Sequence, residues 1–147
     1  VVSAPLAPAP PQPASSIERE SFVLCLDNEL QVREAMATLL GGWGCRVVTA
    51  ASQAEALAEV ARAGRLPDLV LADFHIDDGP DGLAVVEALR AEWKQMVPAA
   101  LVTADRDPTL RVRARTRQVE LLHKPVKPAS LRALLRLRGS TAGRLTA

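Results

Sequence analysis

The chain has 147 residues, a length typical of one compact domain and too short for two full ones. Hydrophobic residues make up 48% of it, enough for a buried core, so the composition excludes a wholly disordered chain. The net charge of +1 lacks the basic excess typical of proteins that bind nucleic acid or anionic membranes, so we expect direct contact with neither. Charge is uneven along the chain: residues 1–104 carry 7 basic and 14 acidic side chains, and residues 105–147 carry 11 and 3.

Two cysteines, Cys25 and Cys45, lie in apolar, strand-like stretches without a CxxC or a Cys/His metal-binding spacing. We therefore predict buried, unreactive thiols in a reducing compartment. The sequence has neither an apolar run long enough to span a bilayer nor a signal-peptide pattern at its start. These features favour a cytoplasmic location. Because the chain begins with Val1 instead of methionine, we expect it to be a piece of a longer protein.

Three segments are predicted along the chain. Five of the eleven prolines fall within residues 4–13, so residues 1–20 are predicted to form an extended Pro/Ala-rich linker. Residues 21–138 contain the periodic apolar pattern of a folded domain. Residues 139–147 are predicted to form a short flexible tail.

Short apolar stretches alternate with helix-length periodic ones through residues 21–138. Alternation of this kind is typical of successive βα units around a parallel sheet. It predicts an α/β fold of three layers, in which a doubly wound five-stranded parallel sheet lies between five helices. The predicted strands are Phe22–Leu26, Arg46–Thr49, Asp68–Ala72, Ala99–Thr103 and Val119–His123.

The helices are predicted from apolar periodicity and from residues that favour helix starts. Ser52 and Glu55 form a capping box at the start of the second helix, and the third helix is predicted over residues 82–93. Pro108, after an N-cap aspartate, suits the first turn of the fourth helix, and Pro128 suits that of the fifth. The predicted buried face of the first helix contains Val32, Ala35, Met36, Leu39, Leu40 and Trp43.

Polar side chains follow the carboxyl ends of four predicted strands. In an open parallel sheet, ligands bind beyond these strand ends, so we expect the side chains to share one site. Oxygen ligands that converge from separate strands suit a hard divalent cation such as Mg²⁺. The residues are Asp27 and Asn28 after the first strand, Asp73 after the third, Thr103 at the end of the fourth and Lys124 after the fifth.

Four sequence segments have a recognisable pattern: VLCLDNE at residues 23–29, DLVLAD at 68–73, LVTA at 101–104 and HKP at 123–125. Together they resemble the signature segments of the response-regulator receiver domain of two-component systems, in the family's order and across the whole folded domain. The resemblance implies a flavodoxin-like fold with strand order 2-1-3-4-5.

The resemblance also implies phosphoryl transfer in bacterial signal transduction. A phosphohistidine of a histidine kinase or of a histidine phosphotransfer domain would donate its phosphoryl group to Asp73, with Mg²⁺ as the cofactor. The linker and the LLHKPVKP run at residues 121–128 are similar to those of receivers at the C-terminal end of hybrid sensor histidine kinases, and we accordingly expect no output domain after Arg138. The domain would be a phosphoacceptor with at most slow autodephosphorylation, and the parent chain would be a histidine kinase.

Residue roles follow from the same resemblance. Asp73 would be the nucleophile and the phosphorylation site. Asp27, Asp73 and the backbone carbonyl of His75 would hold Mg²⁺. Lys124 would pair with a phosphate oxygen, and a cis peptide bond after it would aim its ammonium at the site. Thr103 would hydrogen-bond another phosphate oxygen and act as a switch that moves the following loop and helix.

Two residue positions depart from the family pattern, in addition to the loop over residues 75–82, which lacks the family's usual proline and is one residue longer. Asn28 replaces a second acid, so it is an additional candidate Mg²⁺ ligand through its amide oxygen, and weaker metal binding is expected. Leu121, at the second switch position, stands where the family usually has Tyr or Phe, which argues against an aromatic switch rotation. Both departures motivate an alternative: a pseudo-receiver that is not phosphorylated and acts as a protein-interaction module.

Single residues of the predicted site also allow simpler interpretations. An aspartate at a strand end often only forms a turn or caps a helix, but four polar strand ends together favour the receiver interpretation. A small phosphatase with an aspartyl nucleophile would need a second acid where His75 stands. His75 either modulates water access at the mouth of the site or is an exposed loop residue, and His123 is interpreted as structural. Asp77, Asp78 and Asp81 are interpreted as loop or N-cap residues, with metal contacts as the alternative.

Five arginines surround the predicted fourth helix, at odd-numbered positions that spread around its axis. One interpretation is a solvated polar helix. The other is that the fourth and fifth helices present a cationic signalling face to an acidic kinase or partner, or form a homodimer contact. The arginines are Arg106, Arg111, Arg113, Arg115 and Arg117.

Overall fold

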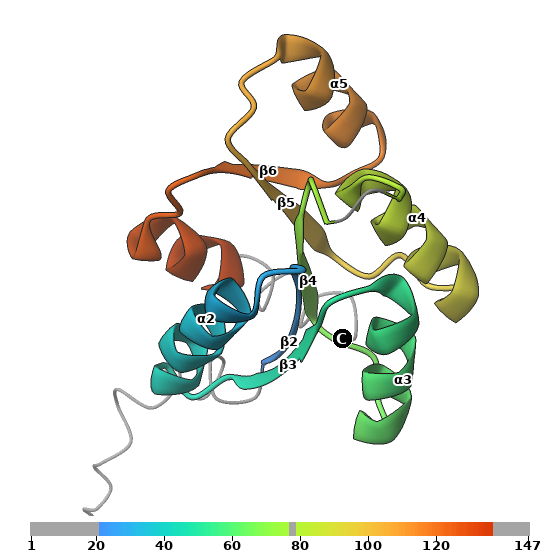
Figure 1. Ribbon diagram of the computed structural model, residues 1–147, viewed down its shortest axis with the longest axis vertical. Coiled ribbons are helices and arrows are strands. Elements are labelled where there is room, and N and C mark those ends of the chain that lie inside the picture. The colour runs from blue at the N-terminus through green and yellow to red at the C-terminus, as the bar shows by residue number, and fades with distance from the viewer. Residues whose placement is uncertain (1–20, 77–78, 137–147) are drawn as a thin grey trace, which may run out of the picture.

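The computed structural model describes residues 21–76 and 79–136 (Figure 1). The predicted linker at residues 1–20 and the predicted tail at residues 139–147 therefore lie outside the described residues, as do Asp77 and Asp78.

Five parallel strands form one sheet in the order β3-β2-β4-β5-β6 (Figure 1). Counted along the chain, this is the predicted order 2-1-3-4-5, so the doubly wound, flavodoxin-like sheet is confirmed. The two outer strands are β3 and β6, and β4 lies in the centre, where every one of its residues is buried. The strands are β2 (Phe22–Leu26), β3 (Arg46–Ala50), β4 (Leu69–Asp73), β5 (Ala99–Thr103) and β6 (Glu120–His123).

Four predicted boundaries, in three strands, were wrong by one residue. β3 extends to Ala50, because Ala50 pairs with the end of β2. β4 begins after Asp68 and ends at Asp73, because Asp73 pairs with Val102 of β5. β6 begins after Val119. The shift in β4 matters for the site, since it makes Asp73 the last residue of a buried strand instead of the first residue of a loop.

In the described part of the chain, five helices cover the sheet, as predicted. Ser52 Oγ accepts a hydrogen bond from Glu55 N at 3.2 Å, and Glu55 Oε1 accepts one from Ala51 N at 2.8 Å. Both side chains of the predicted capping box therefore accept hydrogen bonds from backbone N–H groups at the start of the second helix. None of the helices within the described residues is long and apolar enough to cross a membrane. The helices are α2 (Leu30–Gly42), α3 (Gln53–Ala63), α4 (Gly82–Trp93), α5 (Pro108–Thr116) and a fifth over residues 128–136.

Two apolar clusters, one on each face of the sheet, make the fold three-layered. The first joins the sheet to α3, α4 and α5 through residues such as Val60, Leu89 and Leu110. The second joins it to α2 and the helix over 128–136 through Leu40 and Leu131. Burial of these faces supplies the main free energy that holds the helices on the sheet.

The predicted buried face of α2 was only partly correct. Leu40 is buried, but Ala35 is exposed and Val32 and Met36 are half-buried. The reason is a groove of about 340 Å³ that runs between this face of α2 and Val126. The apolar periodicity therefore marks a helix that covers the sheet only with its C-terminal half.

Candidate functional site

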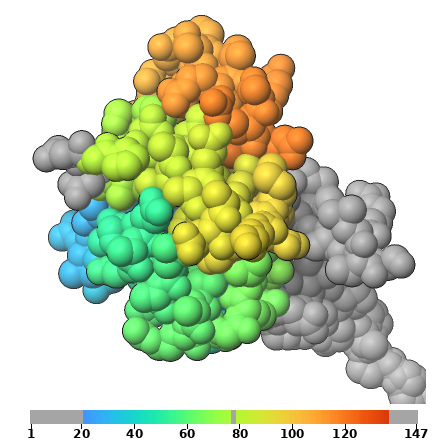
Figure 2. Space-filling model, turned by 90° about the vertical axis from the view of Figure 1, so that its right-hand side faces the viewer, coloured from blue at the N-terminus to red at the C-terminus, as the bar shows by residue number. Residues whose placement is uncertain are grey.

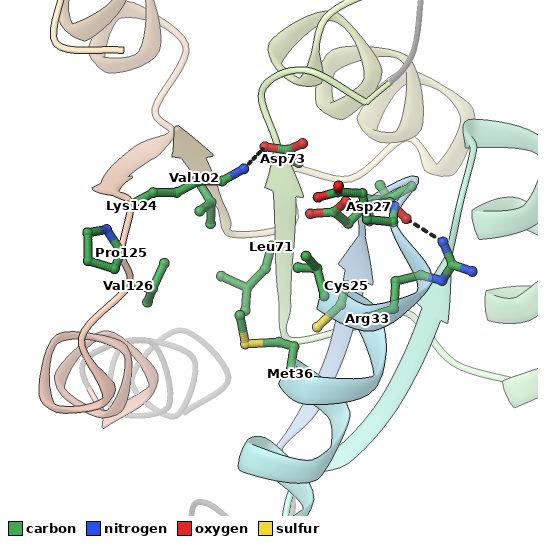
Figure 3. Close-up of a pocket in the computed structure, with 13 residues that line it drawn as sticks. Cys25, Asp27, Arg33, Met36, Leu71, Asp73, Val102, Lys124, Pro125 and Val126 are labelled. Carbon is green, nitrogen blue, oxygen red and sulfur yellow. Dashed lines mark hydrogen bonds and ion pairs between the residues drawn. The ribbon is translucent and has the colours of Figure 1, made fainter. Parts of the chain in front are cut away.

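The carboxyl ends of β2, β4, β5 and β6 bring the predicted site residues to one edge of the sheet (Figure 3). Asp73 ends the central strand β4, and Asp27 follows β2, which pairs with β4. Lys124 follows β6, and Thr103 ends β5 between them. The sheet order explains why residues far apart in sequence meet here.

Asp73 and Lys124 form the central contact of this site. Lys124 Nζ lies 2.9 Å from Asp73 Oδ1, and the Asp73 side chain is buried while the lysine side chain remains partly exposed. The peptide bond between Lys124 and Pro125 is cis, and Lys124 N donates to Thr103 O at 2.8 Å. Despite the nearby ammonium, Asp73 Oδ1 accepts no well-directed hydrogen bond within the described part of the chain. A buried carboxylate oxygen in this state is ready to take a further cationic or electrophilic partner.

Asp27 contributes a second buried carboxylate. Burial is the largest cause that raises the pKa of this carboxyl, and the negative charge of Asp73 raises it further. The Glu29 N–H donates to Asp27 Oδ1 at 2.9 Å, and this bond and the Lys124 ammonium lower the pKa in part. Arg33 donates to the backbone oxygen of Asp27 at 2.7 Å and not to its carboxylate. The carboxylate is therefore left available to a cation.

The oxygen atoms at this edge fit Mg²⁺ better than a softer metal. Within residues 21–76 and 79–136, no three His, Cys, Asp or Glu side chains are close enough to hold a metal ion. Among the described residues, two buried carboxylates lie at this edge, from Asp27 and Asp73. Mg²⁺ suits such a set because it keeps several water ligands. Asn28 and His75 are exposed beside the carboxylates, and their contribution to a metal site stays a prediction.

Thr103 lies at the start of the connection to α5. Its side chain is buried, and its Oγ1 accepts a hydrogen bond from Asp105 N at 3.0 Å. The hydroxyl therefore holds the loop that leads into α5. Leu121, the other predicted switch residue, is half-buried against the apolar cluster under α3, α4 and α5. The switch roles of both residues stay predictions.

The loop after Asp73 contains a close approach that sequence reasoning missed. Gly82 N donates to Phe74 O at 2.7 Å, and a Cβ atom on Gly82 would overlap the backbone carbonyl oxygen of Asp73. Asp81, the N-cap of α4, accepts a bond from Ala84 N at 2.8 Å, as its N-cap interpretation predicts. The only signal in the sequence was a glycine directly after a capping residue. Gly82 thus allows α4 to begin against the phosphoacceptor candidate.

A largely apolar cavity of about 360 Å³ opens at this site, and Asp27, Asp73 and Lys124 are part of its wall (Figure 3). Cys25 faces it from β2, and Met36 and Val126 close it from the helical side. Burial raises the pKa of the Cys25 thiol to about 12, so the thiol stays protonated. Cys45 is buried as well, so the predicted burial of both thiols is confirmed.

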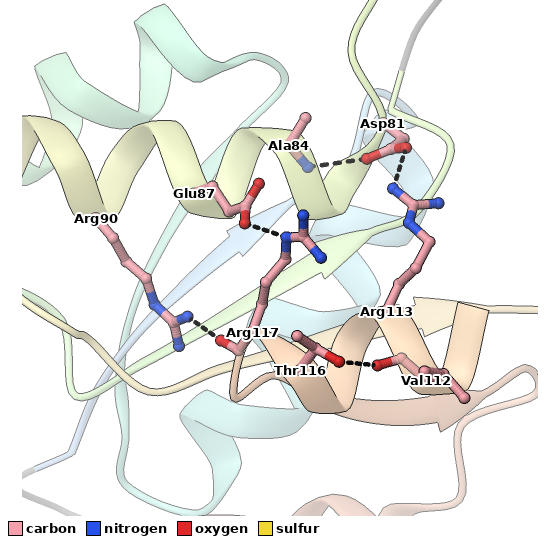
Figure 4. Close-up of polar contacts among 8 residues, drawn as sticks. All are labelled: Asp81, Ala84, Glu87, Arg90, Val112, Arg113, Thr116 and Arg117. Carbon is pink, nitrogen blue, oxygen red and sulfur yellow. Dashed lines mark hydrogen bonds and ion pairs between the residues drawn. The ribbon is translucent and has the colours of Figure 1, made fainter. Parts of the chain in front are cut away.

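Two of the five arginines around α5 form ion pairs within the domain (Figure 4). Arg113 forms an ion pair with Asp81 at 3.3 Å, and Arg117 forms one with Glu87. Both contacts tie α5 to α4, and Figure 2 shows the two helices in direct contact on this face. Two of the five arginines thus have a structural role inside the domain.

Comparisons with known proteins identify the family and support the fold. Residues 23–136 match the family model described as response regulator receiver domain. The chain is 32% identical over 116 residues to the KDP operon transcriptional regulatory protein KdpE of Escherichia coli, covering 78% of this chain and 49% of that protein. It is 27% identical over 113 residues to the phyllosphere-induced regulator PhyR of Methylorubrum extorquens, covering 77% and 41%.

A solved structure supports the fold independently. A response regulator receiver domain protein from Clostridium thermocellum aligns with a TM-score of 0.76 at 20% identity, covering 86% of this chain and 99% of that one. The chain spans about half the length of KdpE and less than half that of PhyR.

Proposed function

Because this chain belongs to the response regulator receiver domain family, we propose that Asp73 accepts a phosphoryl group from a phosphohistidine of a histidine kinase or of a histidine phosphotransfer domain. The observation that carries the proposal is the state of Asp73 Oδ1. This oxygen is buried, lacks a well-directed hydrogen bond in the described residues and lies 2.9 Å from Lys124 Nζ. A buried carboxylate oxygen whose partner is a single, partly exposed ammonium can accept a further partner, and this supports a functional role.

In the proposed transfer, a carboxylate oxygen of Asp73 attacks the phosphorus atom opposite the leaving imidazole. The oxygen–phosphorus bond forms while the phosphorus–nitrogen bond breaks, and the imidazole leaves with the electron pair of that bond and the proton on its other nitrogen. The Lys124 ammonium already lies beside Asp73, so it is placed to offset charge on a phosphate oxygen without reorganisation. Its role is electrostatic, as a positioned point charge.

Receiver domains generally use Mg²⁺ for phosphorylation, and the oxygen atoms at this edge suit that ion. When bound, Mg²⁺ supplies positive charge that offsets the negative charge of the transferred group. Asp27 and Asp73 would hold it through their carboxylates and His75 through its backbone carbonyl, with the Asn28 amide as a further candidate ligand. Without a cation, Asp27 and Asp73 repel each other, which agrees with the raised pKa of Asp27.

Thr103 is proposed to report phosphorylation to α5. Its hydroxyl would turn to donate to a phosphate oxygen, and the hydrogen bond from Asp105 N to Oγ1 would weaken or shift. Asp105 lies in the loop that leads into α5, so this exchange would alter the start of the helix. Leu121 has no ring that could rotate into the space left by Thr103, so the signal would pass through the loop alone.

We further propose that the domain belongs to a hybrid sensor histidine kinase. The Pro/Ala-rich residues 1–20 and the LLHKPVKP run at residues 121–128 support this context. The domain would then be modified once per transfer, with at most slow self-dephosphorylation, and catalytic turnover would belong to the kinase part of the parent chain. A second copy, docked through α5 and the helix over 128–136, is a further candidate partner.

Intact-protein mass after incubation with acetyl phosphate tests the proposal. The wild type is expected to gain one phosphoryl group only when Mg²⁺ is present, and Asp73→Asn is expected to gain none. Asp68→Asn is the matched control, because Asp68 lies at the opposite end of β4 from Asp73. There its Oδ2 accepts a hydrogen bond from Phe22 N. Labelling of Asp73→Asn equal to that of the control would contradict the proposal.

The alternative function is that of a pseudo-receiver, an interaction module that is not phosphorylated. Asn28 favours it, because the exposed amide brings no charge to the metal site. The same experiment separates the two functions: a folded wild type that stays unlabelled with Mg²⁺, while a known receiver labels in parallel, would support the pseudo-receiver. Repeated hydrolysis of a phosphomonoester would instead support an aspartyl phosphatase.

A further inference from the structure

The cavity at the carboxyl ends of the strands extends well beyond the polar groups that the proposed phosphotransfer uses. Its volume of about 360 Å³ lies within the range of roughly 300–1,000 Å³ that is usual for small-molecule sites. Below the contact between Asp73 and Lys124, its walls are formed by apolar side chains from β2, β4, β5, α2 and the segment after the cis peptide bond (Figure 3). Five of them are Cys25, Leu71, Val102, Met36 and Val126.

These five side chains make the lower part of the cavity a poor place for water. None of them carries a charge, because burial raises the pKa of the Cys25 thiol to about 12 and keeps it protonated. A neutral thiol in such surroundings acts as a small apolar group. Because protein interiors are otherwise closely packed, an apolar space of this size favours an apolar guest over water.

The wall toward α2 separates this cavity from the groove along that helix. Val32, Met36 and Val126 line both the cavity and the groove of about 340 Å³. Met36 is half-buried and unbranched, so its side chain can change rotamer without a shift of the backbone. An elongated apolar guest can therefore extend from the cavity along α2.

Acidic side chains outnumber basic ones among the described residues that line the cavity. The acids are Asp27, Glu29 and Asp73, and the bases are Arg33 and Lys124. Arg33 donates to the backbone oxygen of Asp27 at 2.7 Å. Asp73 is 7% exposed, and its Oδ1 accepts no well-directed hydrogen bond although Lys124 Nζ lies beside it. The polar mouth of the cavity therefore attracts a cation more than an anion.

We propose that this cavity binds a small organic cation with an elongated apolar body, of the class of the primary alkylamines. The ammonium group would lie between the carboxylates of Asp27 and Asp73, and the alkyl chain would lie among the five apolar side chains. An ammonium has three N–H donors, so one head group can bind both carboxylates. A hydrated Mg²⁺ ion would satisfy the same carboxylates but would leave the apolar walls uncovered.

The amine and Mg²⁺ would compete, because both would use the carboxylates of Asp27 and Asp73. A bound amine would therefore slow the Mg²⁺-dependent phosphorylation of Asp73. This consequence rests on the proposed function, whereas the binding of the amine does not. The site would make the receiver sensitive to a small molecule as well as to its phosphodonor.

Isothermal titration calorimetry with octylamine, in buffer without divalent cations or a phosphodonor, tests the binding. We expect saturable binding of one octylamine per chain, and weaker binding when Mg²⁺ is added. Octanol, which has the same chain without the charge, is expected to bind about fivefold more weakly, and octanoate more weakly still. Asp27→Asn is expected to bind octylamine about fivefold more weakly than the wild type and octanol equally well.

A variant that fills the cavity tests the place of the alkyl chain. Val126→Phe puts a larger side chain into the cavity, so it is expected to bind octylamine at least tenfold more weakly. Val112→Phe is the matched control, because Val112 is 62% exposed on α5 and lies outside the cavity. Met36→Phe fills the space from the opposite wall and is expected to act like Val126→Phe. Thermal unfolding establishes that each variant is folded.

Four results would overturn the proposal. They are no saturable binding of octylamine by the folded wild type, equal affinities for octylamine and octanol, tighter binding of octanoate, and equal affinities of folded Val126→Phe and Val112→Phe. A wild type that binds octylamine but gains no phosphoryl group from acetyl phosphate would contradict the proposed function and support the amine site. A wild type that is phosphorylated but does not bind octylamine would do the reverse.

Discussion

Buried charged groups are hydrogen-bonded to different extents at the site formed by the strand ends and at the α4–α5 contact. At the site, Asp73 Oδ1 lacks a well-directed hydrogen bond, and the pKa of the Asp27 carboxyl is raised by burial. At the contact, the buried Arg90 guanidinium donates to three backbone carbonyls, those of Val97 at 3.0 Å, Arg117 at 2.7 Å and Gln118 at 3.0 Å. The fully hydrogen-bonded charge of Arg90 holds elements together, whereas the incompletely hydrogen-bonded carboxylates leave room for a ligand.

The largest expected effect comes from breaking the satisfied region. Arg90→Met keeps most of the side-chain volume but leaves three carbonyl oxygens without this donor, so we expect a loss of about 2–4 kcal/mol of unfolding free energy. Urea denaturation measures it. Arg62→Met, at an exposed position on α3, is the control, with a change of about 0.5 kcal/mol or less. Equal losses in the two variants would show that Arg90 holds nothing together.

Gly82→Ala tests the backbone that carries the unsatisfied site. The new Cβ would overlap the Asp73 carbonyl oxygen, so α4 or the end of β4 must shift, at a cost of about 1–3 kcal/mol. Slower labelling by acetyl phosphate is expected as well. Gly41→Ala is the matched control, because nothing lies within 4 Å of its added Cβ and a helical alanine is favoured by about 0.5–1 kcal/mol. If Gly82→Ala proved as stable as the control, this would contradict the close approach of Gly82 to the Asp73 carbonyl oxygen.

Asp27→Asn tests how the charge of the Asp27 carboxylate affects the pH dependence of stability. A carboxyl whose pKa is higher in the folded than in the unfolded protein binds more protons when folded, so stability falls as pH rises from the ordinary aspartate range through the raised pKa. Above that range, Asp27→Asn is expected to be more stable than the wild type by about 1 kcal/mol. Its stability is also expected to lack this decrease with pH. Its Mg²⁺ binding is expected to be weaker. Urea denaturation across a pH series without divalent cations measures it. An unchanged slope in the variant would assign the pH dependence to another group.

The smallest effect is expected at the exposed ion pair between Glu87 and Arg117. Both side chains are largely open to solvent, so Glu87→Gln should cost about 0.5 kcal/mol or less. A double-mutant cycle with Arg117→Gln isolates the pair energy, which is expected to fall further in high salt. A coupling energy as large as the effect of Arg90→Met would contradict this ranking, because the exposed pair would then hold α4 to α5 as strongly as the buried guanidinium does.

Local patterns were sufficient to predict much of the fold. Apolar stretches such as Phe22–Leu26 and Ala99–Thr103 were located correctly, because buried parallel strands are apolar along their whole length. The helix starts at Ser52 and Asp107 followed from capping, which depends only on neighbouring residues. The strand order came from the family resemblance, since alternation alone does not order the strands.

Long-range contacts account for what the sequence could not predict. Arg90 looks like any helical arginine until the fold brings the carbonyls of residues 117 and 118 to it. The space needed at Gly82 depends on where β4 ends, and the contact of Arg33 with the Asp27 backbone depends on how α2 leaves its strand. Asp73 was identified as the central candidate because its place after an apolar strand is itself a local pattern.

The measurement that most directly tests the role of Asp73 is the location of the phosphoryl group. The wild type is incubated with acetyl phosphate and Mg²⁺ and then reduced with borohydride, which converts an aspartyl phosphate into homoserine, and its peptides are sequenced by mass spectrometry. We expect homoserine at position 73 and at no other aspartate. Homoserine at another aspartate, or a phosphorylated protein without homoserine, would contradict the assignment of Asp73 as the phosphoacceptor.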